Sequence, residues 1–85
     1  MTKEQLGQVC AKYAARLDAR GCSPVRNIEE KTLEGRLNHV RWMCDETPRL
    51  AEESLEKAMR WLGFMQGAMA VADVMTIAEM KEDNR

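Results

Sequence analysis

The chain has 85 residues, of which 45% are hydrophobic and 32% charged, with a formal net charge of -1 at pH 7. This length predicts a single domain, residues 1–85, whose small core leaves much surface exposed, so we expect partner chains. The composition excludes intrinsic disorder. The charge balance, nine basic against seven acidic residues over 1–49 and four against seven over 50–85, is too even to indicate a nucleic-acid-binding protein.

The first predicted helix begins after a capping box. Thr2 and Gln5 have the spacing at which a hydroxyl and a side-chain amide each satisfy a free backbone N–H group. Apolar residues then recur at steps of three and four, which is typical of a helix with one buried face. These residues are Leu6, Val9, Cys10, Tyr13, Ala14 and Leu17. The helix is expected to stop at Gly21, which adopts the left-handed conformation easily, and "GCSPVRN" is expected to form a turn around Pro24.

A second helix is predicted to begin at Asn27 as N-cap, with Glu30 completing a capping box. Its apolar residues again follow steps of four and three. They are Leu33, Leu37, Val40 and Cys44, with Trp42 and Met43 widening the face. We expect this helix to end before Pro48, because proline breaks the backbone hydrogen-bond pattern of a continuing helix.

A third helix is predicted to begin with Thr47 as N-cap and Pro48 in the first turn. It carries two apolar stripes. The first has the alternating spacing of a heptad seam and is expected to face the chain's own helices; it comprises Ala51, Leu55, Ala58, Leu62, Met65, Met69 and Ala72. The second stripe comprises Trp61, Phe64, Ala68, Val71 and Met75. The second half of the helix is therefore apolar around most of its circumference.

Three interpretations compete for this apolar stretch: a membrane span, the centre of a small core, or a surface covered by another chain. The membrane interpretation fails on length, because residues 61–75 number 15, short of the roughly 18 to 20 residues that a bilayer requires. Gly63 and Gly67 have G-x-x-x-G spacing, which lets another helix approach closely. That helix belongs either to the same chain or to a second chain, and the sequence leaves both alternatives open. Trp42 and Trp61 are expected to join the second and third helices.

A short fourth helix is predicted near the C-terminus of the chain. The third helix is expected to end near Val74, and Thr76 with Glu79 repeats the capping-box spacing. The polar segment "IAEMKEDNR" follows it.

No pattern of catalytic or metal-binding residues is evident. Cys10, Cys22 and Cys44 have no C-x-x-C spacing, so neither a disulfide framework nor a zinc site is expected, and a reducing cytoplasm fits them. The only histidine, His39, lies five residues from Cys44, and on a helix the two point about 140° apart. We therefore expect a structural histidine, no cofactor and no enzymatic activity. The opening "MTKEQLGQVC" lacks the order of a signal peptide, so no export is expected.

Nucleic-acid binding is an alternative. Lys12, Arg16 and Arg20 stand at four-residue steps on the first helix, where they could follow a phosphate backbone. Acidic residues lie among the cations, and no recognition helix is evident. A solvated face is the simpler interpretation, so nucleic acid is an unexpected partner.

The C-terminal half of the chain carries a resemblance. It pairs the pattern H-x-x-W-M with EKAMRWLGF-x-QG and closes on I-x-E-x-K-x-x-N, over residues 39–84. In these motifs it resembles a group of small uncharacterised helical proteins encoded by tailed bacteriophages and by prophages of Gram-negative bacteria. The resemblance implies a phage accessory protein made in the bacterial cytoplasm, which binds host or phage machinery. The first helix lies outside it, and "AMAVADV" departs from the group, which often has a further aromatic residue and a glycine there.

Together these observations predict an all-α fold: a small bundle of three main helices with a short C-terminal helix, forming a homodimer around the third helix. The expected function is a non-enzymatic phage accessory protein that acts by protein–protein binding, including the inhibition or redirection of a host factor. A small DNA-binding regulator and a component of the virion or its assembly are the alternatives. The candidate interface residues are Trp61, Gly63, Phe64, Gly67, Ala68, Val71 and Met75.

Overall fold

Four helices make up the part of the chain that the structure, a computed structural model, describes: residues 1–27 and 31–85. They are α1 (Lys3–Ala19), α2 (Leu33–Glu53), α3 (Leu55–Val71) and α4 (Ile77–Asp83). These residues contain no strand. The predicted fold class, an all-α bundle of three main helices with a short C-terminal helix, is therefore confirmed.

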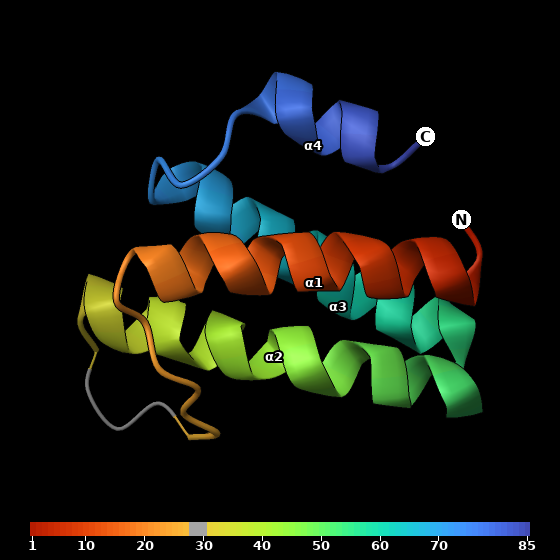
Figure 1. The fold of residues 1–85 in the computed structure, drawn as a ribbon, viewed down its shortest axis with the longest axis horizontal. Helices are drawn as coiled ribbons and strands as arrows, with labels where there is room; N and C mark the ends of the chain where they lie inside the picture. Colours follow the sequence, from red (N-terminus) through yellow and green to blue (C-terminus); the bar gives the residue numbers. More distant parts are fainter. Residues whose placement is uncertain (28–30) are drawn as a thin grey trace.

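The three long helices form a small bundle in which α2 packs against both α1 and α3 (Figure 1). Two ion pairs show that α1 and α2 are antiparallel. Lys3 at the start of α1 reaches Glu52 at the end of α2, and Asp18 at the end of α1 reaches Arg41 in the first half of α2. The short helix α4 lies beyond α1 and α3, so that both chain termini are on the same side of the molecule (Figure 1).

The local signals at α1 are confirmed in detail. The backbone N–H of Gln5 donates to Thr2 Oγ1 over 3.1 Å, and the backbone N–H of Thr2 donates to Gln5 Oε1 over 2.8 Å. This is the reciprocal capping box expected from the sequence. The helix ends at Ala19, and Gly21 has a φ of 93°, which a residue without a Cβ atom adopts at little cost.

The predicted start of the second helix is wrong. Asn27 is exposed and does not cap a helix, while Glu30, its predicted capping partner, lies outside the described residues. Instead α2 begins at Leu33 with Thr32 as N-cap, because Thr32 Oγ1 accepts a 3.0 Å hydrogen bond from the backbone N–H of Gly35. Asn27 and Thr32 are both residue types that cap helices, and the helix begins at Thr32, which is closer to the apolar residues of the buried face.

The predicted boundary between the second and third helices is also wrong. The helix α2 continues through Pro48 to Glu53, and Ser54 alone separates it from α3. Thr47 is not an N-cap: it is fully buried inside α2, and its hydroxyl donates to Met65 Sδ over 3.3 Å. Continuation of the helix keeps Ala51 buried against the bundle, and this packing offsets the hydrogen bond that Pro48 cannot form.

Ser54 supplies the break that the sequence pattern places at Thr47 and Pro48. Its backbone is extended, with φ of -155° and ψ of 104°, and its hydroxyl accepts from the backbone N–H of Lys57 over 3.1 Å. One serine therefore ends α2 and caps α3.

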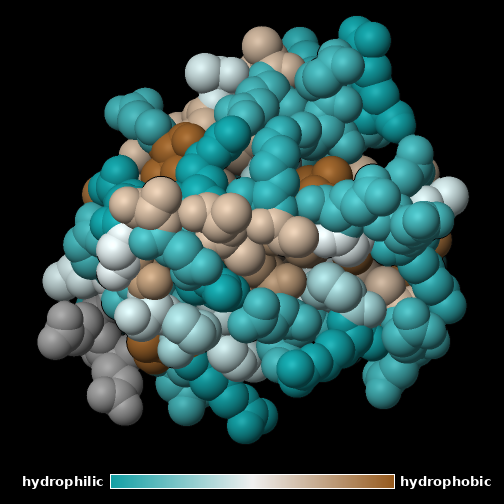
Figure 2. Space-filling model, viewed as in Figure 1, coloured by the Kyte–Doolittle hydropathy of each residue, from teal (hydrophilic) through white to brown (hydrophobic). Residues whose placement is uncertain are grey.

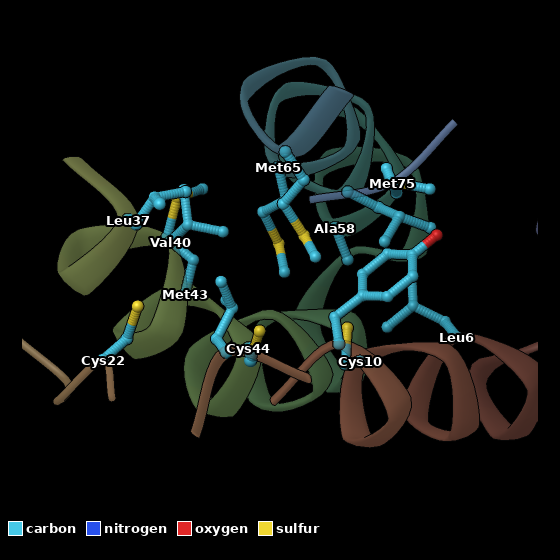
Figure 3. Close-up of a cluster of buried hydrophobic side chains, with 14 of the residues drawn as sticks. Leu6, Cys10, Cys22, Leu37, Val40, Met43, Cys44, Ala58, Met65 and Met75 are labelled. Atoms are coloured by element: carbon cyan, nitrogen blue, oxygen red, sulfur yellow. The ribbon is translucent and has the colours of Figure 1, made fainter. Parts of the chain in front are cut away.

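The heptad seam of the third predicted helix forms the centre of the core. Its members Ala58, Leu62, Met65 and Met69 are buried on α3, whereas Ala51 is buried at the end of α2. Leu55 and Ala72 are half-buried at the ends of the seam. Figure 3 shows Met65 pointing from α3 toward the layer that contains Cys10 and Cys44. The prediction that this stripe faces the chain's own helices is confirmed.

The helix α3 ends at Val71, three residues before the predicted end near Val74. Asp73 has a φ of 59°, and the backbone N–H of Val74 donates to the carbonyl of Met69 over 2.8 Å, which closes the last turn. The predicted cap of the fourth helix is confirmed, since Thr76 Oγ1 accepts from the backbone N–H of Glu79 over 3.1 Å. Within the described residues, no helix combines the length and hydropathy that crossing a membrane requires.

Candidate functional site

A groove lies between the first half of α2 and the second half of α3. Its volume is about 530 Å³. The two helices are antiparallel neighbours, so the start of α2 lies beside the end of α3 (Figure 1). The walls are mainly apolar and are formed by Leu33, Arg36, Leu37, His39 and Val40 from α2 and by Phe64, Gly67, Ala68 and Val71 from α3.

The rim of this groove holds three large apolar side chains that are half exposed or more. Val71 is 87% exposed, Phe64 58% and Leu33 50%. Single exposed apolar residues are common on soluble proteins, but three around one concave surface indicate a place where another molecule binds. The groove is therefore the candidate functional site, and its surface is mainly apolar.

The structure brings together five of the seven candidate interface residues. Phe64, Gly67, Ala68 and Val71 line the groove, and Gly63 is exposed one turn away on the same helix. The other two lie elsewhere. Met75 is buried in the core at 6% exposure, so it is not available at the surface.

Trp61 joins α3 to α2 rather than lining the groove. Its ring lies 6.3 Å from the ring of Trp42, centroid to centroid, at an angle of 41°. Both indoles are half-buried against the core. The expectation that the two tryptophans connect the second and third helices is confirmed, and the exposed part of the second stripe begins at Phe64.

Gly63 and Gly67 are open to solvent. A Cβ atom built on either glycine would meet no heavy atom within 4 Å outside the local helix backbone. The interpretation in which they admit a neighbouring helix of the same chain is therefore wrong. Each mid-helix glycine costs about 1 kcal/mol relative to alanine, and no contact within the described part of the chain offsets that cost.

The α2 wall of the groove was not expected from the sequence. Leu33 and Leu37 have ordinary core spacing, and only the packing of α2 on α3 shows that Leu33 remains half exposed while Leu37 is buried. The four-residue step from Leu33 to Leu37, with Arg36 beside it, was the available signal. It does not distinguish the edge of a core from the wall of a groove.

His39 has the surroundings of a structural residue. Its Nδ1 lies 3.2 Å from the carbonyl of Val25, to which it donates, and its ring stacks on Trp42 with centroids 5.4 Å apart. Cys44 lies in the core. The two side chains thus do not form a nucleophile–base pair.

The three thiols are buried. Burial raises the pKa of Cys10 and of Cys44 to about 12, and it also raises the pKa of Cys22. At neutral pH these groups remain protonated, and a protonated thiol is a poor nucleophile and a poor metal ligand. Among residues 1–27 and 31–85, no group of three His, Cys, Asp or Glu side chains could hold a metal ion.

The basic residues of α1 are engaged by carboxylates of the same chain. Lys12 Nζ lies 2.6 Å from Asp83, Arg16 pairs with Glu79, and Arg20 Nη2 lies 3.2 Å from Glu34. The face that carries α1 is mostly hydrophilic, and a band of moderately hydrophobic residues, coloured pale brown, crosses its middle (Figure 2). Cations that already have partners have less to gain from phosphate contacts, so this arrangement favours a structural role for all three.

Polar contacts fasten α4 to the bundle. Tyr13 Oη donates to Asp83 Oδ2 over 2.7 Å, and it accepts from Gln66 Nε2 over 3.0 Å. Gln66, which is 1% exposed, also exchanges two hydrogen bonds of 2.7 and 3.0 Å with Asn84. No residue of α4 is fully buried, and Met80 is half-buried against the core, so these polar contacts act together with partial apolar packing to hold the helix in place.

We expect acid to loosen α4 before the rest of the bundle. The guanidinium of Arg16, whose Nη1 lies 2.7 Å from Glu79 Oε1, holds the pKa of Glu79 below its usual value of 4.5. Because the folded pKa is lowered, this ion pair stabilises the docked helix above about pH 4.5 and is lost as the pH falls through the folded pKa. Hydrogen exchange of the α4 amides, measured between about pH 6 and pH 3, should show protection lost first in α4.

Glu79→Gln is the control for this acid sensitivity. It keeps the shape of the side chain and removes its titration, so α4 should be less protected at neutral pH and its protection should change less on acidification. Unchanged protection of wild-type α4 across the acid range would contradict the assignment.

Comparison of the chain with protein-family models, with curated proteins and with solved structures finds no match.

Proposed function

We propose that this chain is a phage-encoded, non-enzymatic accessory protein that acts by protein–protein binding and forms a homodimer in the bacterial cytoplasm. The observation that carries the binding function is the apolar groove between α2 and α3, with Leu33, Phe64 and Val71 exposed at its rim. The phage origin rests on the sequence motifs of residues 39–84. Inhibition or redirection of a host factor belongs to this class of function.

Several observations support binding over catalysis. The groove is lined mainly by apolar side chains, together with Arg36 and His39. The ring of His39 is hydrogen-bonded to the carbonyl of Val25 and stacked on Trp42. The thiols are buried away from it. When a partner covers apolar surface that is exposed in the isolated chain, the free energy of the system falls.

The proposal predicts that the wild-type chain is a dimer at micromolar concentration and that Val71→Glu is a monomer. Val71 is 87% exposed, so its replacement removes little from the fold of the single chain. At a twofold interface the substitution acts twice, removing an apolar contact and placing a carboxylate in an apolar groove. We expect the dimer dissociation constant to rise by about 100-fold or more. Sedimentation velocity over a range of concentrations measures it.

Ile77→Glu is the matched control, because Ile77 is also an exposed apolar residue, at 54%, and it lies on α4 outside the groove. This variant should dimerise like the wild type. A wild-type chain that is monomeric at all concentrations, or a Val71→Glu chain that dimerises as well as Ile77→Glu, would overturn the dimer.

A further inference from the structure

We infer that the groove is covered by a second copy of this chain whose α3 crosses the first in the antiparallel direction, so that Arg36 of each protomer faces Glu56 of the other. The inference rests on the proposed function and adds the orientation and the charge contacts of the interface.

The glycine pair on α3 is open to close approach by another helix. A Cβ atom placed on Gly63 or Gly67 would have no neighbouring heavy atom within 4 Å, and the two glycines lie beside Phe64 and Val71 on the exposed side of α3. In an antiparallel crossing centred at the level of residue 65, Gly63 of one protomer meets Gly67 of the other. Two helix backbones can approach closely there, and the groove of each protomer, which extends along residues 64–71 of α3, is then covered by residues 59–66 of the partner's α3.

The surface available to a second copy runs the length of α3. With a rise of 1.5 Å per residue, the 17 residues of α3 span about 25 Å. The adjoining groove along α2 widens this strip. A stable interface buries about 800 Å² on each partner, which is more than α3 alone presents, so the contact must also include the edge of α2.

Charged residues of opposite sign lie at the two ends of this surface. Glu56 is exposed at the start of α3, and Arg36 is exposed on α2, beside the end of α3. Neither forms an ion pair within the described residues. An antiparallel crossing brings the start of one α3 to the end of the other, and so places each Glu56 near the partner's Arg36.

The remaining charges of α3 agree with this direction. Arg60 lies in the first half of the helix and Asp73 just beyond its end; both are exposed, and neither has an ion-pair partner among residues 1–27 and 31–85. An antiparallel dimer brings Arg60 toward the partner's Asp73. A parallel dimer would place Arg60 beside the partner's Arg60, and Asp73 beside the partner's Asp73, which is repulsive.

Charge reversal distinguishes the two directions. In the antiparallel dimer, Arg36→Glu puts two carboxylates together at each end of the interface, and Glu56→Arg puts two guanidinium groups together. We expect each single variant to dimerise about tenfold more weakly than the wild type at low salt. The double variant Arg36→Glu/Glu56→Arg should recover the wild-type dissociation constant, and an equimolar mixture of the two single variants should form heterodimers with wild-type affinity.

A parallel dimer gives a different result, because residue 36 then lies at the same level as residue 36 of the partner. Reversing the charge there replaces one like pair with another, so single variants would dimerise as well as the wild type. Glu4→Arg is the control: Glu4 is exposed in the first turn of α1, as Glu56 is in the first turn of α3. It should leave dimerisation unchanged.

Sedimentation velocity and native mass spectrometry of these variants decide the inference. Weak single variants with recovery in the double variant and in the mixture support it. A dimeric wild type whose single variants are unaffected overturns the antiparallel orientation and leaves the proposed homodimer standing. A monomeric wild type overturns both, and leaves the groove to a different protein.

Discussion

Met65→Ala is expected to lower the free energy of unfolding by about 2–5 kcal/mol. Met65 is fully buried at the centre of the heptad seam, between α3 and the side chains of α1 and α2 (Figure 3). Truncation removes apolar contacts and leaves a cavity that the surrounding helices fill only in part. It also removes the sulfur to which the buried hydroxyl of Thr47 donates. Urea denaturation followed by circular dichroism measures the change.

Met59→Ala is the matched control, since Met59 lies on the same helix, is 42% exposed, and loses the same atoms. Its effect should be below about 1 kcal/mol. Both variants must be compared with the wild type at one protein concentration, because the proposed dimerisation would add to the stability of the folded chain. Equal losses for the two methionines would contradict the assignment of the seam to the core.

The elements that the sequence predicted correctly are those fixed by neighbouring residues. The caps at Thr2 and Thr76 depend on a hydroxyl and a backbone N–H three residues away, and both form as expected. The heptad seam was equally reliable. Five of its seven residues are buried and two are half-buried, although the break at Ser54 places Ala51 on α2 and the others on or next to α3.

The boundary errors arise where local preference competes with packing. Thr47 and Pro48 have the local features of a helix start, yet α2 runs through them because Thr47 and Ala51 gain more from burial in the bundle. Ser54 offered a weaker signal, a single serine within a charged segment, and it became the break. From the sequence alone, a proline is the stronger indication of a boundary.

The groove shows a different limit of sequence reasoning. The apolar second half of α3 indicated an uncovered surface, and Phe64, Gly67, Ala68 and Val71 do lie on it. Its opposite wall on α2 depends on how far the first turn of α2 stands from the end of α3. No pattern of spacing within one helix encodes that separation. The prediction for Met75 failed because the helical periodicity that places it in the exposed stripe stops at the end of α3, at Val71. Beyond that point the chain turns, and Met75 lies in the core.

Tyr13→Phe is expected to lower the free energy of unfolding by about 1–3 kcal/mol and to release α4 from the bundle. Tyr13 is fully buried, and its hydroxyl is the point at which α1, α3 and α4 meet through Gln66 and Asp83. Burial and the neighbouring carboxylate of Asp83 raise the pKa of Tyr13, so the hydroxyl stays a donor at neutral pH. Phenylalanine keeps the ring and its packing but leaves Asp83 Oδ2 without this donor. Hydrogen exchange of the α4 amides and urea denaturation report the two effects.

Lys12→Met isolates the contribution of the tyrosine hydroxyl, because Lys12 contacts the same carboxylate from the surface. The side chain of Lys12 is 43% exposed and that of Asp83 is 10% exposed. A solvent-screened ion pair contributes about 0–1 kcal/mol, so Lys12→Met should leave α4 largely protected while Tyr13→Phe exposes it. If the two variants loosen α4 equally, the buried hydroxyl contributes no more than the exposed ion pair, which contradicts the prediction. Loss of protection with Tyr13→Phe only would instead show that a buried hydrogen bond to one hydroxyl holds the C-terminal helix in place.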